Sequence, residues 1–252
     1  MQRTVAVLLA TLLGVAACGG GPEESDPSAP PDDGAVSLTY DFEDGSDGWA
    51  SEITDYTEAT RPEDVLSETG VSPPGLDAGS SFFHLAASNP SDDLFAYLLR
   101  EVTADAGLEG DRTYSADFAV AFASDAPTGC AGIGGAPGES VYLKVGASPE
   151  QPVPMSQDDG SRLSVDKGGQ SQGGDAAVVA GTIENGIPCE EALEGERPPY
   201  AMVSLSGALE VTTAKDGSLW LFVGTDSGFE GRTSIYYDRI EVTLTPVDAT
   251  GS

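Results

Sequence analysis

The stretch from Leu219 to Pro246, LWLFVGTDSGFEGRTSIYYDRIEVTLTP, constrains the fold more than any other part of the sequence. Near its end, Ile240, Val242 and Leu244 alternate with polar residues. This is the period of a β-strand that has one buried face and one solvent-exposed face. A glycine-containing loop separates this strand from a second apolar segment, so the stretch predicts two neighbouring strands of an all-β fold.

The same alternation, continued towards the N-terminus, places Tyr236 and Asp238 on the buried face. A buried carboxylate needs a partner, because leaving it unpaired costs about 3 kcal/mol or more. Asp238 is therefore expected to meet either Arg232 or Arg239, or to take part in a metal site.

The rest of the chain supports an all-β interpretation. Its 32 glycines and 17 prolines suit a turn-rich β protein, and no alternation of strands with long helices is visible. We predict a two-sheet antiparallel β-sandwich of the jelly-roll type, with about ten strands and long loops. Further strands are predicted at 36–43, 81–87, 112–123, 141–145, 162–165, 176–183 and 201–211, and at 94–102, where a short helix is the alternative. Residues 57–80 and 190–199 are predicted to be irregular loops.

The charge balance excludes one class of partner. The chain has 42 acidic and 11 basic residues, a formal net charge of −31. Nucleic acids are bound through a basic stripe, and the sequence contains none, so no nucleic-acid partner is expected.

The N-terminal residues predict export. Residues 1–17 hold one arginine and a short apolar run, and the run ends in Val15-Ala16-Ala17-Cys18. This pattern resembles the signal of bacterial lipoproteins, which implies cleavage before Cys18 and attachment of lipid to it. The organisation expected is a signal peptide at 1–17, a lipidated cysteine with a polar tether at 18–34, a β-sandwich at 35–247 and a flexible tail at 248–252. Such a protein would be a membrane-anchored lipoprotein of the bacterial cell envelope, on its periplasmic side or at the cell surface.

The two remaining cysteines, Cys130 and Cys189, form an even pair in an exported domain. A disulfide is the simplest interpretation of such a pair. A metal site is the alternative, but the sequence offers no neighbouring histidine or third cysteine to complete a zinc site.

The sequence does not indicate a metalloprotease or a nucleotide-binding enzyme. It contains no H-E-x-x-H motif and no phosphate-binding loop, and we expect no organic cofactor. His84, the one histidine, is opposite in phase to Phe83 and Leu85 and is expected to be a polar strand residue at the surface. Pairs of carboxylates suited to glycoside hydrolysis arise by chance among 42 acids, so they do not indicate an enzyme.

Two groups of residues are candidates for a site. Asp41 and Glu43 lie at the end of the first predicted strand, and Asp238 lies in the last strand. If these strands are neighbours, the three carboxylates form a candidate site for a structural calcium ion, which takes six to eight oxygen ligands. Trp49 and Trp220 are the candidate ligand-binding aromatics, because sugars stack on aromatic rings. The alternatives are that the neighbouring acids Asp44 and Asp47 are turn residues while Asp238 meets Arg232 or Arg239, and that both tryptophans pack in the core.

The two ends of the domain, YDFEDGSDGW and SIYYDRIEV, together with the phrase GLEGDRTY, resemble bacterial carbohydrate-binding-module-like jelly rolls of the galactose-binding-like type. The middle of the chain resembles uncharacterised bacterial lipoproteins instead. The resemblance implies a structural calcium near the acids named above and sugar binding on a concave face or at a loop edge. The function expected is a lipid-anchored, non-catalytic binding module for a glycan or similar polymer. A structural or assembly component that binds another envelope protein is the alternative, and a carboxylate-dependent glycan-active enzyme comes third.

Overall fold

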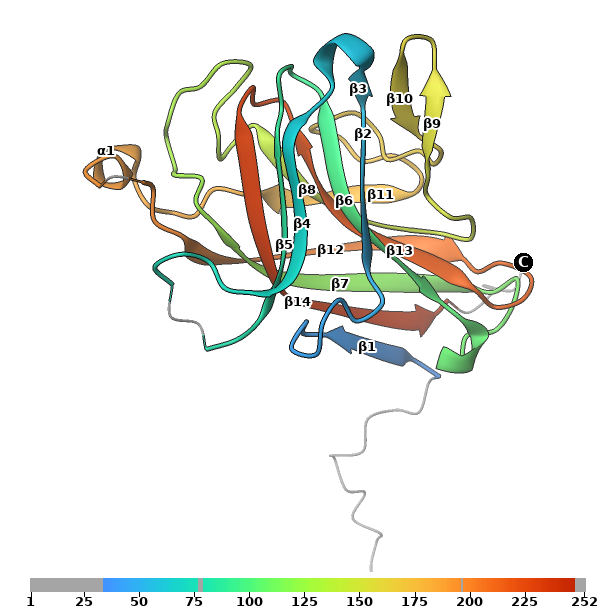
Figure 1. The fold of residues 1–252 in the computed structure, drawn as a ribbon. Coiled ribbons are helices and arrows are strands. Elements are labelled where there is room, and N and C mark those ends of the chain that lie inside the picture. Colours follow the sequence, from blue (N-terminus) through green and yellow to red (C-terminus); the bar gives the residue numbers. More distant parts are fainter. Residues whose placement is uncertain (1–33, 77–78, 196, 248–252) are drawn as a thin grey trace, which may run out of the picture. The chain divides into compact units, whose positions relative to one another are not determined.

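The computed structural model describes residues 34–76, 79–195 and 197–247. These residues form fourteen strands, arranged as a six-stranded sheet, a five-stranded sheet and a small three-stranded sheet (Figure 1). The strand pairings in all three sheets are antiparallel. The predicted all-β sandwich is therefore confirmed, with more strands than the sequence pattern indicated.

The six-stranded sheet is called sheet A. Its spatial order is β12 (Ala201–Thr212), β7 (Thr113–Ser124), β14 (Arg232–Pro246), β5 (Phe82–Ser88) and β4 (Glu63–Val71), with β1 (Val36–Tyr40) paired to the second half of β14. The first and last strands of the domain are thus neighbours, as the sequence analysis anticipated.

The five-stranded sheet is called sheet B. Its order is β11 (Ala177–Thr182), β8 (Val141–Ser148), β13 (Leu219–Ser227), β6 (Leu94–Val102) and β2 (Ala50–Thr54). The small sheet contains β3 (Tyr56–Thr57), β10 (Gly160–Leu163) and β9 (Pro154–Gln157). The helical elements are two 3-10 turns, Glu58–Thr60 and Ala104–Ala106, and a single helical turn, α1 (Cys189–Ala192).

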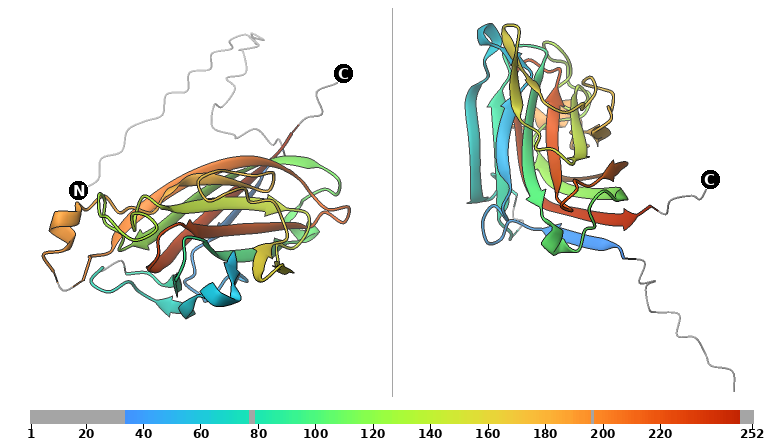
Figure 2. Two further views of the ribbon diagram at one scale, coloured as in Figure 1. Left: turned by 90° about the horizontal axis from the view of Figure 1, so that it is seen from above. Right: turned by 90° about the vertical axis from the view of Figure 1, so that its right-hand side faces the viewer.

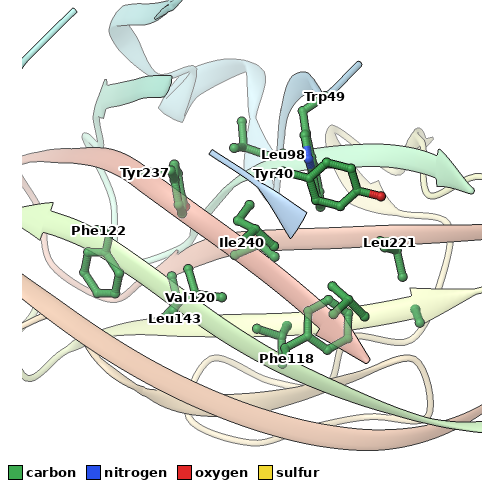
Figure 3. Close-up of a cluster of buried hydrophobic side chains, with 14 of the residues drawn as sticks. Tyr40, Trp49, Leu98, Phe118, Val120, Phe122, Leu143, Leu221, Tyr237 and Ile240 are labelled. Atoms are coloured by element: carbon green, nitrogen blue, oxygen red, sulfur yellow. The ribbon is translucent and has the colours of Figure 1, made fainter. Parts of the chain in front are cut away.

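The main core lies between sheets A and B. Figure 3 shows Tyr237 and Ile240 of β14 in this core together with Tyr40, Trp49 and Leu98. Strands contribute alternate residues to the core, because successive side chains point to opposite faces of a sheet. The remaining side chains form the outer faces of the two sheets, which are the faces turned away from the core.

The predicted inward direction of Tyr236 and Asp238 is wrong. A β-bulge interrupts the register of β14 between Tyr237 and Arg239, so Tyr237 faces the core together with Ile240. A bulge adds one residue to a strand, and every residue before it therefore changes face. Asp238 is half-buried at the bulge and accepts a hydrogen bond from the Ser80 hydroxyl at 3.0 Å.

Two segments predicted to be irregular contain regular structure. Residues 63–71 form the edge strand β4, whose side chains are mostly exposed, and residues 189–192 form α1. An edge strand without a buried face has no apolar alternation, so its composition gave no signal. The segment 94–102, predicted as a strand with a helix as the alternative, is β6.

The segment GLEGDRTY, residues 107–114, has a structural explanation. Gly107 ends a 3-10 turn with φ of +96°, a conformation that favours glycine. Leu108 then enters the core, and the buried Tyr114 hydroxyl accepts a hydrogen bond from the Glu109 amide at 2.9 Å. The phrase thus fixes the entry of the chain into β7.

The helix α1 and the β9–β10 hairpin lie on opposite sides of the two large sheets (Figure 1, and the left view of Figure 2). No helix within the described residues has the length and the apolar composition needed to cross a bilayer.

Candidate functional site

A groove of about 660 Å³ lies on the outer face of sheet A and is called the tyrosine groove. Prolines form part of its wall, and its polar and aromatic lining consists of His84, Asp125, Arg197, Tyr200, Arg232, Ser234 and Tyr236. Apolar surface with a few converging polar groups is the usual character of a small-molecule or sugar site.

Strand alternation builds the floor of the groove. Phe83 and Leu85 of β5 point into the core, so His84 between them points outwards. Tyr237 of β14 also points inwards, so Tyr236 points outwards, and it lies directly opposite His84 in the register of the two strands. The rings of His84 and Tyr236 stack at a centroid distance of 3.8 Å, with their planes 7° apart.

Tyr200, just before β12, forms the second aromatic surface. Its ring stands edge-on to Tyr236, with centroids 5.1 Å apart and planes at 85°. Its hydroxyl is hydrogen-bonded to the Ser234 hydroxyl at 2.9 Å. Two tyrosine rings therefore meet at a right angle, with hydroxyl groups at the corner.

A line of hydrogen bonds crosses the outer face of sheet A at this point. Ser234 Oγ lies 2.9 Å from Nε2 of His84, and Nδ1 of the same ring lies 3.3 Å from a carboxylate oxygen of Glu68. Burial lowers the pKa of His84, and it outweighs the opposing effect of Glu68. The imidazole is thus neutral at neutral pH, and a ring that donates from Nδ1 to Glu68 accepts at Nε2 from Ser234.

Asp125 and Arg232 are two charged residues that line the groove. Burial raises the pKa of the half-buried Asp125, against the opposing effects of hydrogen bonds and of Arg232. The exposed Arg232 donates a hydrogen bond from Nη1 to the Asp64 carbonyl at 3.2 Å, which holds it over β4.

A smaller and more apolar hollow of about 320 Å³ adjoins the groove and is called the apolar pocket. Its apolar walls include Ala126, Pro127, Ile183, Leu193 and Phe229. The two hollows share the lining residues Asp125, Pro198, Arg232 and Ser234. Ser234 therefore lies where the polar groove meets the apolar pocket.

The predicted disulfide between Cys130 and Cys189 is confirmed, with a Cα–Cα distance of 5.1 Å. It joins the loop after β7 to the start of α1, and both cysteines line the apolar pocket. The disulfide therefore holds two walls of this pocket in place.

The outer face of sheet B is covered by the chain itself. Residues 149–176 cross it, and the Tyr97 hydroxyl donates a hydrogen bond to the Pro152 carbonyl at 3.3 Å. Beneath this segment, the outward side chains of β6 and β13 form a second buried cluster: Phe95, Tyr97, Leu99 and Phe222, with Ala177 of β11.

Buried charges lie under the same covering segment. Nζ of the fully buried Lys144 donates to the carbonyls of Lys167, Gly169 and Gln172 and lies 3.0 Å from Asp226. Nζ of Lys167 lies 2.5 Å from the same carboxylate oxygen of Asp226.

Asp55 lies 2.7 Å from Nζ of Lys167, and Arg162 lies 3.0 Å from Asp93. The carboxylates of Asp55, Asp93 and Asp226 come within 4.8 Å of one another, which is close enough to share a cation. Three cationic side chains already compensate these three carboxylates: Lys144, Lys167 and Arg162. We interpret this ion cluster as a closed structural feature, because a buried charge is stable when it is paired and hydrogen-bonded.

The predicted calcium residues lie near one another but contact neighbouring chain segments. Glu43 accepts a hydrogen bond from the Ser81 amide at 3.2 Å, and Asp238 accepts one from Ser80. Asp41 accepts one from the Glu43 amide at 3.3 Å. Among the described residues, Asp41, Glu43 and Asp238 do not form a group of three carboxylates within 4.8 Å.

The predicted ligand-binding tryptophans have different positions. Trp49 is 3% exposed and packs edge-on against Tyr40 in the core, with centroids 5.4 Å apart, so its ring offers no surface to a ligand. Trp220 is half-buried on the outer face of sheet B and lines a hollow of about 400 Å³ beside Arg100 and Gln151. Cys18, the predicted lipidation site, lies outside the described residues.

Most of the tyrosine groove was not predicted from the sequence. Tyr236 was predicted to face the core, Tyr200 had no predicted position, and nothing local distinguishes Ser234 or Asp125. For His84, the direction away from the core was predicted correctly, but the predicted surface position is wrong, because the side chain is only 4% exposed under its neighbours. Its partners Glu68 and Ser234 lie 16 and 150 positions away. Only the strand register brings them together.

Comparison with known proteins gives a fold likeness. No protein-family model matches the sequence, and no curated protein is significantly similar to it. Among solved structures, a carbohydrate-binding module of the β-sandwich superfamily is similar with a TM-score of 0.36 and 12% identity, over 83% of this chain and 61% of that one.

Two further solved structures are similar over most of their length. The xylan-binding domain CBM22-1 of Paenibacillus barcinonensis Xyn10C has 8% identity and a TM-score of 0.38, over 84% of this chain and 95% of that one. The Stig cyclase Fisc of Fischerella sp. TAU has 12% identity and a TM-score of 0.39, over 85% and 100%. This chain is thus similar to both a binding module and a cyclase. The similarity therefore concerns the arrangement of strands and carries no argument about function.

Proposed function

We propose that the protein is a binding module for a glycan or a similar polymer, and that the tyrosine groove holds the ligand. The observation that carries this proposal is the half-buried ring of Tyr200, which stands edge-on to the buried Tyr236 with hydroxyl and charged groups around it. A sugar ring has apolar C–H faces, which stack on aromatic rings, and hydroxyl groups at its edge, which hydrogen-bond to polar side chains. The groove offers both kinds of contact.

Retention on insoluble polysaccharides and on peptidoglycan sacculi tests this proposal. The full-length protein is used in mild detergent, and Tyr200→Ala is compared with Trp220→Ala, which alters the other half-buried aromatic candidate. We expect retention of the wild type on one polymer, binding weakened about tenfold or more in Tyr200→Ala, and unchanged binding in Trp220→Ala.

Other outcomes are equally informative. Loss of binding in Trp220→Ala with normal binding in Tyr200→Ala would move the ligand to the outer face of sheet B. A folded wild-type protein that no polymer retains would contradict the glycan-binding proposal.

Calcium remains a second proposal for this domain, supported by the proximity of Glu43 and Asp238 to the Ser80–Ser81 segment. Carboxylates and main-chain carbonyls in turns are the ligands that calcium prefers. A calcium site would raise Tm in millimolar calcium relative to EDTA, and Asp238→Asn would remove that difference. Equal Tm values in calcium and EDTA would contradict it.

Lipid attachment at Cys18 also remains a proposal, supported by the sequence Val15-Ala16-Ala17-Cys18. Metabolic labelling with a palmitate analogue would mark the wild type and leave Cys18→Ala unmarked. Equal labelling of both proteins would contradict lipid attachment at Cys18.

A second candidate function is assembly with another envelope protein, and β12 supports it. This twelve-residue strand pairs with β7 on one side and, among the described strands, has no partner on the other. Met202 on it is 43% exposed. Open edge strands offer main-chain hydrogen bonds to a partner strand. A photo-crosslinking residue at position 202 would capture such a partner in cells, and one at Glu241, on the same sheet, would not.

A further inference from the structure

Three side chains on the outer face of sheet A have the arrangement of a nucleophile, a base and an orienting acid. Ser234 is on β14, His84 on β5 and Glu68 on β4, so each comes from a different and adjacent strand. Glu68 and His84 are direct register partners. The distances of 2.9 Å from Ser234 Oγ to Nε2 and 3.3 Å from Nδ1 to Glu68 are those of linked hydrogen bonds.

The imidazole is held in the orientation that such a base requires. The stacked ring of Tyr236 fixes its plane, and Glu68 accepts from Nδ1, which leaves Nε2 as the acceptor towards Ser234. His84 is 4% exposed, and its lowered pKa keeps it neutral and able to accept a proton near pH 7.

The surroundings of Ser234 are divided into two compartments. The serine lines both the apolar pocket of about 320 Å³ and the tyrosine groove of about 660 Å³. A carboxylic ester has a comparable division, because its acyl group is apolar and its alcohol part can be a polar sugar. The apolar pocket suits the acyl group, and the groove suits the alcohol.

We propose that Ser234 is the nucleophile of a carboxylic-ester hydrolase site, with His84 as the general base and Glu68 as the residue that positions His84. Ser234 Oγ bonds to the carbonyl carbon while its proton passes to Nε2 of His84. The bond to the alcohol oxygen then breaks, and the alcohol leaves with that proton. Water next attacks the acyl carbon and gives a proton to His84, and Ser234 leaves and takes the proton back. The net reaction converts ester and water into acid and alcohol.

Two groups are placed to stabilise the oxyanion. The Tyr200 hydroxyl lies 2.9 Å from Ser234 Oγ, and Arg232 lines both hollows. Donors that point to the developing negative charge supply much of the rate enhancement in acyl transfer. This activity goes beyond ligand binding and does not depend on a glycan being the ligand.

Covalent labelling tests the proposal directly. The full-length protein in mild detergent is treated with a fluorophosphonate probe, and the modified peptide is identified by mass spectrometry. We expect an adduct on Ser234 that forms faster as the pH rises through the pKa of His84, and that does not form after unfolding in urea. Ser206 on β12, an exposed serine of the same sheet, is the internal control. A folded protein with no adduct on Ser234, or with equal labelling of Ser206, would overturn the proposal.

Hydrolysis of p-nitrophenyl acetate and butyrate gives the second readout. We expect Ser234→Ala to lower the rate above buffer by about 100-fold or more, and Ser206→Ala to leave it unchanged. Glu68→Gln should lower kcat by about tenfold or more and change the pH profile, which a purely structural role would not do. A rate in folded Ser234→Ala equal to that of the wild type overturns the proposal. Because adduct mapping uses the wild type, the test stands even where a variant does not fold.

Retention on polysaccharide is measured on the same preparations. Normal retention without an adduct on Ser234 overturns the hydrolase site and leaves the binding function in place. An adduct on Ser234 without retention supports the hydrolase site and contradicts glycan binding.

Discussion

The outer faces of sheets A and B both carry ionisable side chains, but a chain segment covers these side chains on sheet B, whereas on sheet A they border a groove. On sheet B, residues 149–176 lie across the strands, and the ion cluster beneath them pairs three carboxylates with three cations. On sheet A, the hydrogen-bonded line of Glu68, His84 and Ser234 borders an open groove. Both faces place ionisable groups in largely buried positions, but only the groups on sheet A border a hollow of this size.

This difference distinguishes polar groups that stabilise the fold from polar groups that a ligand can reach. Lys144 and Lys167 donate to main-chain carbonyls and to shared carboxylates of the protein, so their positive charges are already paired within the cluster. The hydroxyl groups of Ser234 and Tyr200 are hydrogen-bonded to one another at the edge of the tyrosine groove, where a ligand can replace this bond. A buried polar group beside a cavity is therefore the first candidate for a functional residue.

Removing a charge from the ion cluster should have the largest effect on stability. In Asp226→Asn, the ammonium groups of Lys144 and Lys167 lose their shared buried carboxylate. We expect a loss of about 3–5 kcal/mol in the free energy of unfolding, measured by urea denaturation. A loss below about 1 kcal/mol would show that water enters the cluster, and the contrast between the two faces would then disappear.

Removing the disulfide should have the next largest effect. The double variant Cys130→Ser and Cys189→Ser frees two segments that are separated by 59 positions. We expect a loss of about 2–4 kcal/mol, measured by thermal unfolding with the reduced wild type as the matched control. Because both cysteines line the apolar pocket, ester hydrolysis should weaken as well. Unchanged stability in both samples would contradict a structural role for the disulfide.

Asp125→Asn tests the open face and should be stabilising at neutral pH. Burial raises the folded-state pKa of Asp125 above its ordinary value of 3.8, so the folded protein holds this proton more tightly than the unfolded chain does. The carboxyl therefore costs stability as the pH rises from 3.8 through the folded-state pKa.

Asparagine is neutral at every pH and does not carry this cost. We expect Tm of Asp125→Asn to exceed that of the wild type by about 2–4 °C at pH 7, the shift that about 1 kcal/mol gives in a domain of this size. The two Tm values should converge below pH 3.8. A difference that is independent of pH would show that folding does not change the pKa of Asp125.

The smallest effect is expected for the exposed ion pair of Arg239 and Glu241, which lies on the outer face of sheet A away from the groove. Both side chains are about half-exposed and 3.1 Å apart. Glu241→Ala should change the free energy of unfolding by about 0–1 kcal/mol, measured by urea denaturation beside Asp226→Asn. An equal loss in the two variants would contradict the distinction between buried and exposed charges in this protein.

The fold class was predictable because its signals are local. Ile240, Val242 and Leu244 face the core in the order that their alternation indicates, and so do Tyr114, Ala116 and Phe118 of β7. The even pair of cysteines, Cys130 and Cys189, indicated the disulfide. In these cases a residue's neighbours in the sequence contain the information, since a strand turns alternate residues to the same face whatever its partners are.

The candidate site was decided by the tertiary structure. The bulge at Asp238 exchanged the directions of Tyr236 and Tyr237, and one inserted residue of this kind leaves no mark in a periodic pattern. The register of β4, β5 and β14 then placed Glu68, His84 and Ser234 in one line. Trp49, an aromatic candidate in the sequence, was enclosed when β1 packed against β14. The sequence by itself thus determined which faces are apolar, whereas the contacts between side chains depend on strand register, which is set by the packing of the whole domain.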